Sequence, residues 1–164
     1  MHLLIGPVGS GKSTYALRLA ADRRAVHLDL DDWMVRLFRA DRPESGVVEW
    51  YAQRAERCVA QIWSLAQAMA NAGCEVVLEI GMLSRSERER FYAWVDEAAV
   101  DLRVLVLDAP RELRRERIER RNREQGETFS MVVSPEIFEF ASDLWEAPLM
   151  DEIEERSITA IAAT

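Results

Sequence analysis

The sequence GPVGSGKST at residues 6–14 is the feature that most limits how this chain can fold. It directly follows a short apolar run, HLLI, and Gly6, Gly11, Lys12 and Ser13 have the spacing of a phosphate-binding P-loop. Glycines leave room for backbone N–H groups to surround phosphate oxygens, and the helix that begins near Lys12 directs its positive end toward them. The motif therefore predicts a buried strand, a phosphate-binding loop and a helix in succession.

Lys12 is the only lysine among the 21 lysine and arginine residues of the chain. An ammonium is a compact point charge that fits beside the β- and γ-phosphates of a nucleoside triphosphate, whereas the arginine fork is wide and planar. We therefore predict a catalytic Lys12, and we expect the Ser13 hydroxyl to occupy a Mg²⁺ position. The expected cofactors are ATP and Mg²⁺, and the expected nucleotide contacts come from Gly6, Gly9, Ser10, Gly11, Lys12, Ser13 and Thr14.

The rest of the chain alternates between apolar runs and segments with helical periodicity. Buried strands are expected at residues 2–5, 25–30, 75–81, 102–109 and 157–163. Helices are expected at residues 13–23 and 47–73, after Ser86, which has capping-box spacing to Glu89, and after Pro110. Strands that alternate with helices predict a parallel sheet covered on both faces, which is a three-layer α/β fold.

Composition and charge narrow the class of protein. A chain of 164 residues, 49% hydrophobic and 30% charged, is expected to form one globular domain over residues 1–164. No apolar run reaches the ~20 residues of a membrane span and no signal-peptide pattern is present, so we expect a cytoplasmic protein without a membrane partner. The net charge of −8 disfavours nucleic acid as a partner, because phosphate backbones repel an acidic surface.

Carboxylates follow two of the predicted strands. Asp29, Asp31 and Asp32 lie at the end of the second strand, and Glu79 lies at the end of the third. Ligands of open α/β sheets bind beyond the carboxyl ends of the strands, and a phosphoryl-accepting hydroxyl needs a carboxylate to take its proton. We predict Asp31 as this catalytic base and expect Asp29 or Asp32 to cap the next helix. For Glu79 we expect a role at the metal, with a base or a structural residue as alternatives.

Residues 111–124 carry seven arginines against four glutamates, and Leu113 and Ile118 are their only large apolar side chains. Such a helix is too polar for a core, and ion pairs along a solvated face are one explanation. Cations that close onto a transferring phosphoryl group are another, and the position after the fourth strand suits a mobile lid over about 111–127. We predict that Arg117 and Arg121 contact phosphate, and that Arg114 or Arg117 stacks on adenine.

Residues 33–51 lie between the second strand and the long helix, where we expect the acceptor to bind. The predicted substrate-binding residues are Asp32, Trp33, Arg36 and Arg85, although Trp33 could equally be part of the core. Trp63 and Trp94 are expected in the core. The acidity outside the lid favours a neutral or cationic acceptor over a polyanion.

Four motifs together, GPVGSGKST, LDLDDW, VVLEIG…SERERF and LDAPRELRRERIERRN, resemble the P-loop kinases grouped around the 5′-kinase domain of phage polynucleotide kinase. Zeta-type toxins and chloramphenicol phosphotransferase are relatives of that group. The resemblance covers roughly residues 1–130 and implies a five-stranded parallel sheet of order 2-3-1-4-5, Mg-ATP as the donor, and Asp31 at the place of the base. One departure is Gln125, which stands where polynucleotide kinases tend to carry a lid arginine.

The sequence thus predicts an ATP-dependent kinase that transfers the γ-phosphoryl group to a hydroxyl of a small-molecule or nucleoside-like acceptor. Two alternatives remain at this stage. One is a polynucleotide 5′-hydroxyl kinase, which the charge of −8 and Gln125 disfavour. The other is a nucleotide-gated regulatory ATPase without an acceptor, which would need no base near the γ-phosphate.

Overall fold

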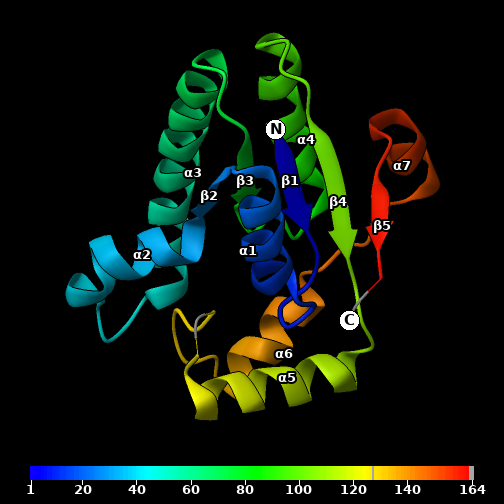
Figure 1. Ribbon diagram of the computed structural model, residues 1–164. Coiled ribbons are helices and arrows are strands. Elements are labelled where there is room, and N and C mark those ends of the chain that lie inside the picture. Colours follow the sequence, from blue (N-terminus) through cyan, green and yellow to red (C-terminus); the bar gives the residue numbers. More distant parts are fainter. Residues whose placement is uncertain (127, 163–164) are drawn as a thin grey trace.

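The computed structural model describes residues 1–126 and 128–162, and its centre is a five-stranded parallel sheet (Figure 1). The strand order is β2-β3-β1-β4-β5, which confirms both the α/β fold class and the implied order. The strands are β1 (His2–Ile5), β2 (Val26–Asp29), β3 (Val76–Glu79), β4 (Arg103–Leu107) and β5 (Thr159–Ile161). Residue 163, part of the expected fifth strand, lies outside the described residues.

Helices cover both faces of the sheet. They are α1 (Lys12–Arg23), α2 (Leu30–Phe38), the short 3₁₀ helix η1 (Arg39–Asp41), α3 (Val47–Asn71), α4 (Arg85–Glu97), α5 (Arg111–Glu124), α6 (Pro135–Asp143) and α7 (Met150–Arg156). Side chains alternate between the faces of a strand, so Leu3 and Ile5 pack with α3 and α4 whereas Leu4 packs with Ala16 of α1. None of the described helices is both long and apolar enough to cross a bilayer.

The helices α5 and α6 lie beyond the carboxyl ends of the strands (Figure 1). They share a small apolar cluster of Ile118, Val133 and Phe138, against which Val8 of the P-loop packs. Arg111 and Arg115 of α5 both form ion pairs with Glu139 of α6. We call these two helices the lid pair, after the lid predicted over about 111–127, which stays a prediction. These contacts with α6 and the P-loop hold α5 against the domain, although α5 is very polar.

Several local predictions were wrong. Helix α2 is the helix that Asp29 or Asp32 was expected to cap. Helices α6 and α7 were not predicted, because each has at most nine residues and so shows little periodicity. The capping box of α4 is Ser84 with Glu87, so Ser86 lies inside the first turn. Trp63 is in the core as expected, but Trp94 is 36% exposed.

Candidate active site

The P-loop connects β1 to α1 and is tightly enclosed by other backbone. Gly6 has φ 148°, and a Cβ there would lie 2.0 Å from the carbonyl oxygen of Leu107 at the end of β4. Gly9 has φ 78°, and a Cβ there would lie 2.7 Å from the carbonyl oxygen of Arg114 in α5. Both positions combine a positive φ with a backbone contact that leaves no room for a side chain. The loop therefore lies directly between the sheet and the lid pair.

Lys12 closes the loop from inside. Its Nζ donates hydrogen bonds to the carbonyl oxygens of Gly6 at 2.8 Å and Pro7 at 3.0 Å. Desolvation lowers the pKa of Lys12, while the negative charges of Glu79 and Asp31 oppose that shift. The ammonium is thus placed between the P-loop and a group of carboxylates.

Glu79 at the end of β3 is almost fully buried beside the P-loop helix. Its Oε1 accepts a hydrogen bond from Ser13 Oγ at 2.8 Å, and its Oε2 lies 3.3 Å from Nε2 of His27, an electrostatic contact without hydrogen-bond alignment. Burial alone would raise the pKa of Glu79, but His27, Lys12 and Ser13 together hold it below its ordinary value. The Ser13 hydroxyl and an ionised Glu79 whose Oε2 accepts no hydrogen bond from the described residues form an oxygen donor set that fits Mg²⁺.

Asp29 is the residue that caps α2. Its Oδ1 accepts a hydrogen bond from the backbone N–H of Asp31 at 2.8 Å, and it lies opposite Glu79 in the register of β2 and β3. Desolvation, followed by the charges of Glu79 and Asp31, raises the pKa of Asp29 to about 7. The cap leaves Asp31 in the first turn of α2, at the carboxyl edge of the sheet.

Asp31 is exposed to solvent and lies within the electrostatic reach of Lys12 and Arg121. Its Oδ1 accepts a hydrogen bond from the hydroxyl of Tyr51 in α3 at 3.2 Å. Desolvation by the surrounding protein and the charge of Glu79 raise the pKa of Asp31, against the opposing effects of Tyr51, Lys12 and Arg121. An accessible carboxylate with a raised pKa suits a group that must take up a proton.

Two of the predicted lid arginines, Arg117 and Arg121, lie near the P-loop or the carboxylates at the strand ends. Arg117 Nη1 donates to the carbonyl oxygen of Ser10 in the P-loop at 3.3 Å. Burial lowers the pKa of Arg121, and the negative charges of Asp31, Glu79 and Asp29 oppose that shift only in part. The Nε of Arg121 is buried without a hydrogen-bond partner among the described residues. The structure thus places Arg117 at the P-loop and Arg121 within electrostatic reach of the carboxylates, and their contact with phosphate stays a prediction.

Arg114 is placed differently from the expectation. It is 5% exposed, and its guanidinium donates to the carbonyl oxygens of Ala109 and Val8 and to Ser142 Oγ, each at 3.0 Å. Through these hydrogen bonds Arg114 connects the P-loop to the lid pair. They do not present the guanidinium to an adenine ring, so of the two candidates only Arg117 keeps that prediction.

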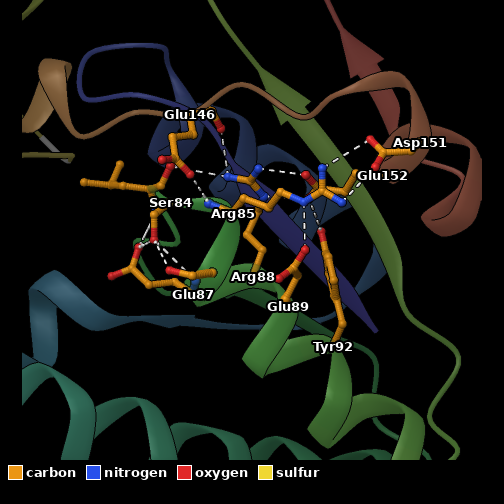
Figure 2. Close-up of polar contacts among 11 residues, drawn as sticks. Ser84, Arg85, Glu87, Arg88, Glu89, Tyr92, Glu146, Asp151 and Glu152 are labelled. Atoms are coloured by element: carbon orange, nitrogen blue, oxygen red, sulfur yellow. Dashed lines mark hydrogen bonds and ion pairs between the residues drawn. The ribbon is translucent and has the colours of Figure 1, made fainter.

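The predicted substrate-binding residues do not all converge. Asp32 and Arg36 form an exposed ion pair on α2, and Trp33 packs partly against the main core. Arg85 instead pairs with Glu89 and with Asp151 of α7, as Figure 2 shows. In the structure the unpredicted α7 supplies a carboxylate, Asp151, that pairs with the guanidinium of Arg85, and a substrate-binding role for Arg85 stays a prediction.

Arg88, one turn further along α4, is itself fully buried and is the centre of a hydrogen-bond network (Figure 2). Its Nε and Nη2 donate to the two carboxylate oxygens of Glu152 in α7 at 2.6 and 2.8 Å, and Tyr92 donates to the same carboxylate at 3.2 Å. Its Nη1 donates to the carbonyl oxygens of Leu83 and Glu146. The network fixes the segment that follows Glu79 against the segment between α6 and α7.

Cavity volume does not identify the site. A cavity of about 440 Å³ lies between α3 and α4, where Trp63 and Trp94 line it. Another of about 550 Å³ lies at the amino-terminal edge of the sheet, near His2 and Thr159. The candidate active site is at the opposite edge and is defined by its convergent charges.

The comparisons agree with this architecture. A family model described as an AAA domain matches residues 1–135, and no curated protein matches the chain. The chain is similar in structure to a gluconokinase from Sinorhizobium meliloti, with 17% identity, a TM-score of 0.64, and 99% of this chain and 82% of that one covered. It is similar to Chaetomium thermophilum Kti12 in complex with ADP-AlF3, with 18% identity, a TM-score of 0.71, and coverage of 98% and 88%. It is also similar to the APS kinase of Mycobacterium tuberculosis in complex with AMPPNP and APS, with 19% identity, a TM-score of 0.61, and coverage of 98% and 87%. At these identities the likeness establishes a shared fold.

Proposed function

This chain belongs to the AAA domain family, and on that premise we propose that it is a P-loop kinase that uses ATP and has a hydroxyl acceptor. The acceptor is a small or nucleoside-like molecule. The observation that carries the proposal is the position of Asp31, an accessible carboxylate within the electrostatic reach of Lys12, at the edge where the P-loop opens. We further propose that residues 1–164 act as one cytoplasmic unit with residues 111–127 as its lid, of which residue 127 lies outside the described residues.

On the donor side, the backbone N–H groups of the P-loop and the ammonium of Lys12 bind the β- and γ-phosphates. Ser13 and Glu79 would hold Mg²⁺, which when bound neutralises charge on the phosphate oxygens. Arg117 and Arg121 come from the other side and stabilise the negative charge on the transferring group.

On the acceptor side, Asp31 orients the hydroxyl and takes its proton. The hydroxyl oxygen forms a bond to the γ-phosphorus as the bond from that phosphorus to the oxygen of ADP breaks, and the proton passes to a carboxylate oxygen of Asp31. The raised pKa of Asp31 favours this transfer, because it brings the basicity of the carboxylate closer to neutrality. The gluconokinase and the APS kinase among the similar structures support a phosphotransferase, and they do not name the acceptor.

The test is a screen for transfer of label from γ-labelled ATP to pools of sugars, nucleosides and 5′-hydroxyl oligonucleotides. Wild-type protein should label at least one pool. Asp31→Asn should abolish transfer to that acceptor while ATP binding persists, and Lys12→Ala should lose both. Asp22→Asn, an exposed carboxylate on α1, is the matched control and should behave as wild type. Label that appears only on water and is unaffected by Asp31→Asn would instead identify a slow regulatory ATPase, and label on oligonucleotide ends a polynucleotide kinase.

A further inference from the structure

We propose that Tyr51 is a positioning residue for Asp31, which holds one carboxylate oxygen so that the other faces the acceptor hydroxyl. The proposal deepens the kinase function and rests on it. Tyr51 lies in the second turn of α3 and Asp31 in the first turn of α2. The contact therefore joins two helices through residues that are 20 positions apart in the sequence. Sequence patterns gave this residue no such role.

Asp31 is fixed from two directions. Its backbone N–H is bound by the cap residue Asp29 at 2.8 Å, and its Oδ1 accepts the hydroxyl of Tyr51 at 3.2 Å. A carboxylate has two oxygens that each accept hydrogen bonds, and the protein occupies one of them. The second oxygen, Oδ2, accepts no hydrogen bond from the described residues, which leaves it for the acceptor.

The hydroxyl of Tyr51 is itself held in place by packing. The ring is half-buried against the main core, and the neighbouring Trp50 meets Phe38 of α2 edge to face at 6.5 Å. The guanidinium of Arg54 covers both rings, 4.3 Å from the centre of Trp50 and 5.7 Å from that of Phe38. These contacts join the start of α3 to the end of α2, so the distance from Tyr51 to Asp31 follows from how the two helices pack.

The contact also has a chemical purpose. Lys12 and Arg121 both attract Asp31, yet no cation forms an ion pair with it within 4.0 Å among the described residues. A carboxylate drawn into such a pair would be a poorer proton acceptor, and the bond to Tyr51 opposes that movement. Burial and the charge of Asp31 raise the pKa of Tyr51, so the phenol stays protonated, donates to Asp31, and cannot replace it as the base.

The experiment compares two tyrosines with matched contacts. Tyr51→Phe removes only the hydroxyl and keeps the ring, and Tyr92→Phe removes a hydroxyl that donates to Glu152, also at 3.2 Å, in the structural network of α4. Steady-state rates are measured with the acceptor that the screen identifies. We expect Tyr51→Phe to lower kcat about tenfold with the KM for ATP unchanged, since the base loses its alignment, while Tyr92→Phe leaves kcat unchanged and lowers only stability.

A double-mutant cycle separates positioning from other effects. Single-turnover transfer is measured for Tyr51→Phe in the wild-type and in the Asp31→Asn background, and the hydroxyl should matter only where the carboxylate is present. Where Asp31→Asn has no measurable transfer, the comparison of kcat between the two tyrosine variants decides.

The outcomes distinguish this inference from the proposed function. If transfer needs Asp31 but Tyr51→Phe keeps full kcat, Tyr51 is structural and the kinase remains. An equal loss of rate in both backgrounds also overturns the positioning role. If the wild-type protein labels no acceptor, the kinase proposal fails and this one with it.

Discussion

At the scale of single residues, the site depends on side chains whose chemistry cannot be exchanged, and Lys12 is the clearest of them. The chain uses arginine wherever a surface cation suffices and keeps its one lysine for the P-loop. There the ammonium fits between the carbonyl oxygens of Gly6 and Pro7, both within 3.0 Å. A planar guanidinium has neither the size nor the geometry for that position.

The prediction is that Lys12→Arg weakens ATP binding at least ~10-fold, although the charge is kept, because shape rather than charge is lost. Isothermal titration calorimetry with Mg-ATP measures this effect. Arg18→Lys, an exposed change on α1 in the opposite sense, is the control and should leave the affinity unaltered. Equal affinities for Lys12→Arg and wild type would contradict the assignment.

A second prediction at this scale concerns pH. The pKa of Asp29 is raised from 3.8 to about 7, so between these values the folded state binds a proton that the unfolded state releases. The stability of the wild-type protein should therefore fall as the pH rises from about 4 to about 7. Asp29→Asn keeps the cap of α2, since an amide oxygen also accepts the N–H bond, and it removes the titration.

Urea unfolding at pH 5 and pH 8 tests this. The wild-type protein should lose more stability between the two pH values than Asp29→Asn does. Asp31, whose pKa is also raised, contributes in the same sense to both proteins and leaves a residual slope. A parallel pH dependence in the two proteins would show that Asp29 is not protonated in the folded state.

At the scale of elements, a buried ion pair between Arg88 and Glu152 holds the helix α4 against α7. Arg88 has no exposed surface and Glu152 is 3% exposed, so removing one partner leaves the other charge uncompensated in the core. Such a loss costs more than the pair itself contributes, because the remaining ion cannot be solvated. The pair joins α4 to α7 and thereby fixes the end of the segment that follows Glu79.

We expect Arg88→Met to lower the free energy of unfolding by about 3–5 kcal/mol. Arg85→Met is the matched control, because Arg85 lies three residues before Arg88 on the same helix and pairs with exposed carboxylates. Its loss of stability should be only a small fraction of that for Arg88→Met. Urea denaturation of both variants gives the comparison, and the double variant Arg88→Met with Glu152→Leu should recover part of the stability. A loss for Arg88→Met no larger than that for Arg85→Met would show that the buried pair is not needed.

The same elements show what the sequence could and could not predict. The P-loop and the carboxylates Asp31 and Glu79 at the carboxyl ends of the strands follow from local patterns, which is why they were available without a structure. The sheet order came instead from the resemblance to the P-loop kinases. Ser84 and Ser86 both have capping-box spacing, and only the contacts of Glu87 with Leu83 and Ser84 decide between them. The contacts of Tyr51 with Asp31 and of Arg88 with Glu152 join distant segments, and no local pattern records them.

At the scale of the whole molecule, the order of the strands assembles the site. With β1 between β3 and β4, the P-loop, Glu79 and the root of the lid pair all emerge at one edge. The lid pair is then fastened to the P-loop by Arg114, which binds the carbonyl oxygen of Val8. A nucleotide in the P-loop would contact the sheet, α1 and the lid pair together, so its binding should stabilise the whole fold.

Thermal unfolding with Mg-ATP checks this. A ligand at 100 times its Kd adds about 2.7 kcal/mol to the stability of the folded state, so the Tm should rise with ATP concentration. Chelation of Mg²⁺ with EDTA should reduce the rise, because Ser13 and Glu79 then have no ion to share with the phosphates. The Tm of Lys12→Ala should not rise with ATP. If the Tm of the wild-type protein does not change with ATP, this would count against nucleotide binding.

Gly6 has one consequence for how this chain can vary over generations. A single-base change in a glycine codon encodes either glycine again, a stop, or an amino acid that carries a Cβ, and at this position that atom would lie 2.0 Å from the Leu107 carbonyl oxygen. Apart from the other glycine codons, codon 6 therefore has no tolerable neighbour in the genetic code. In a mutational library read out by folding alone, without any selection for activity, it should be among the most strongly depleted sites.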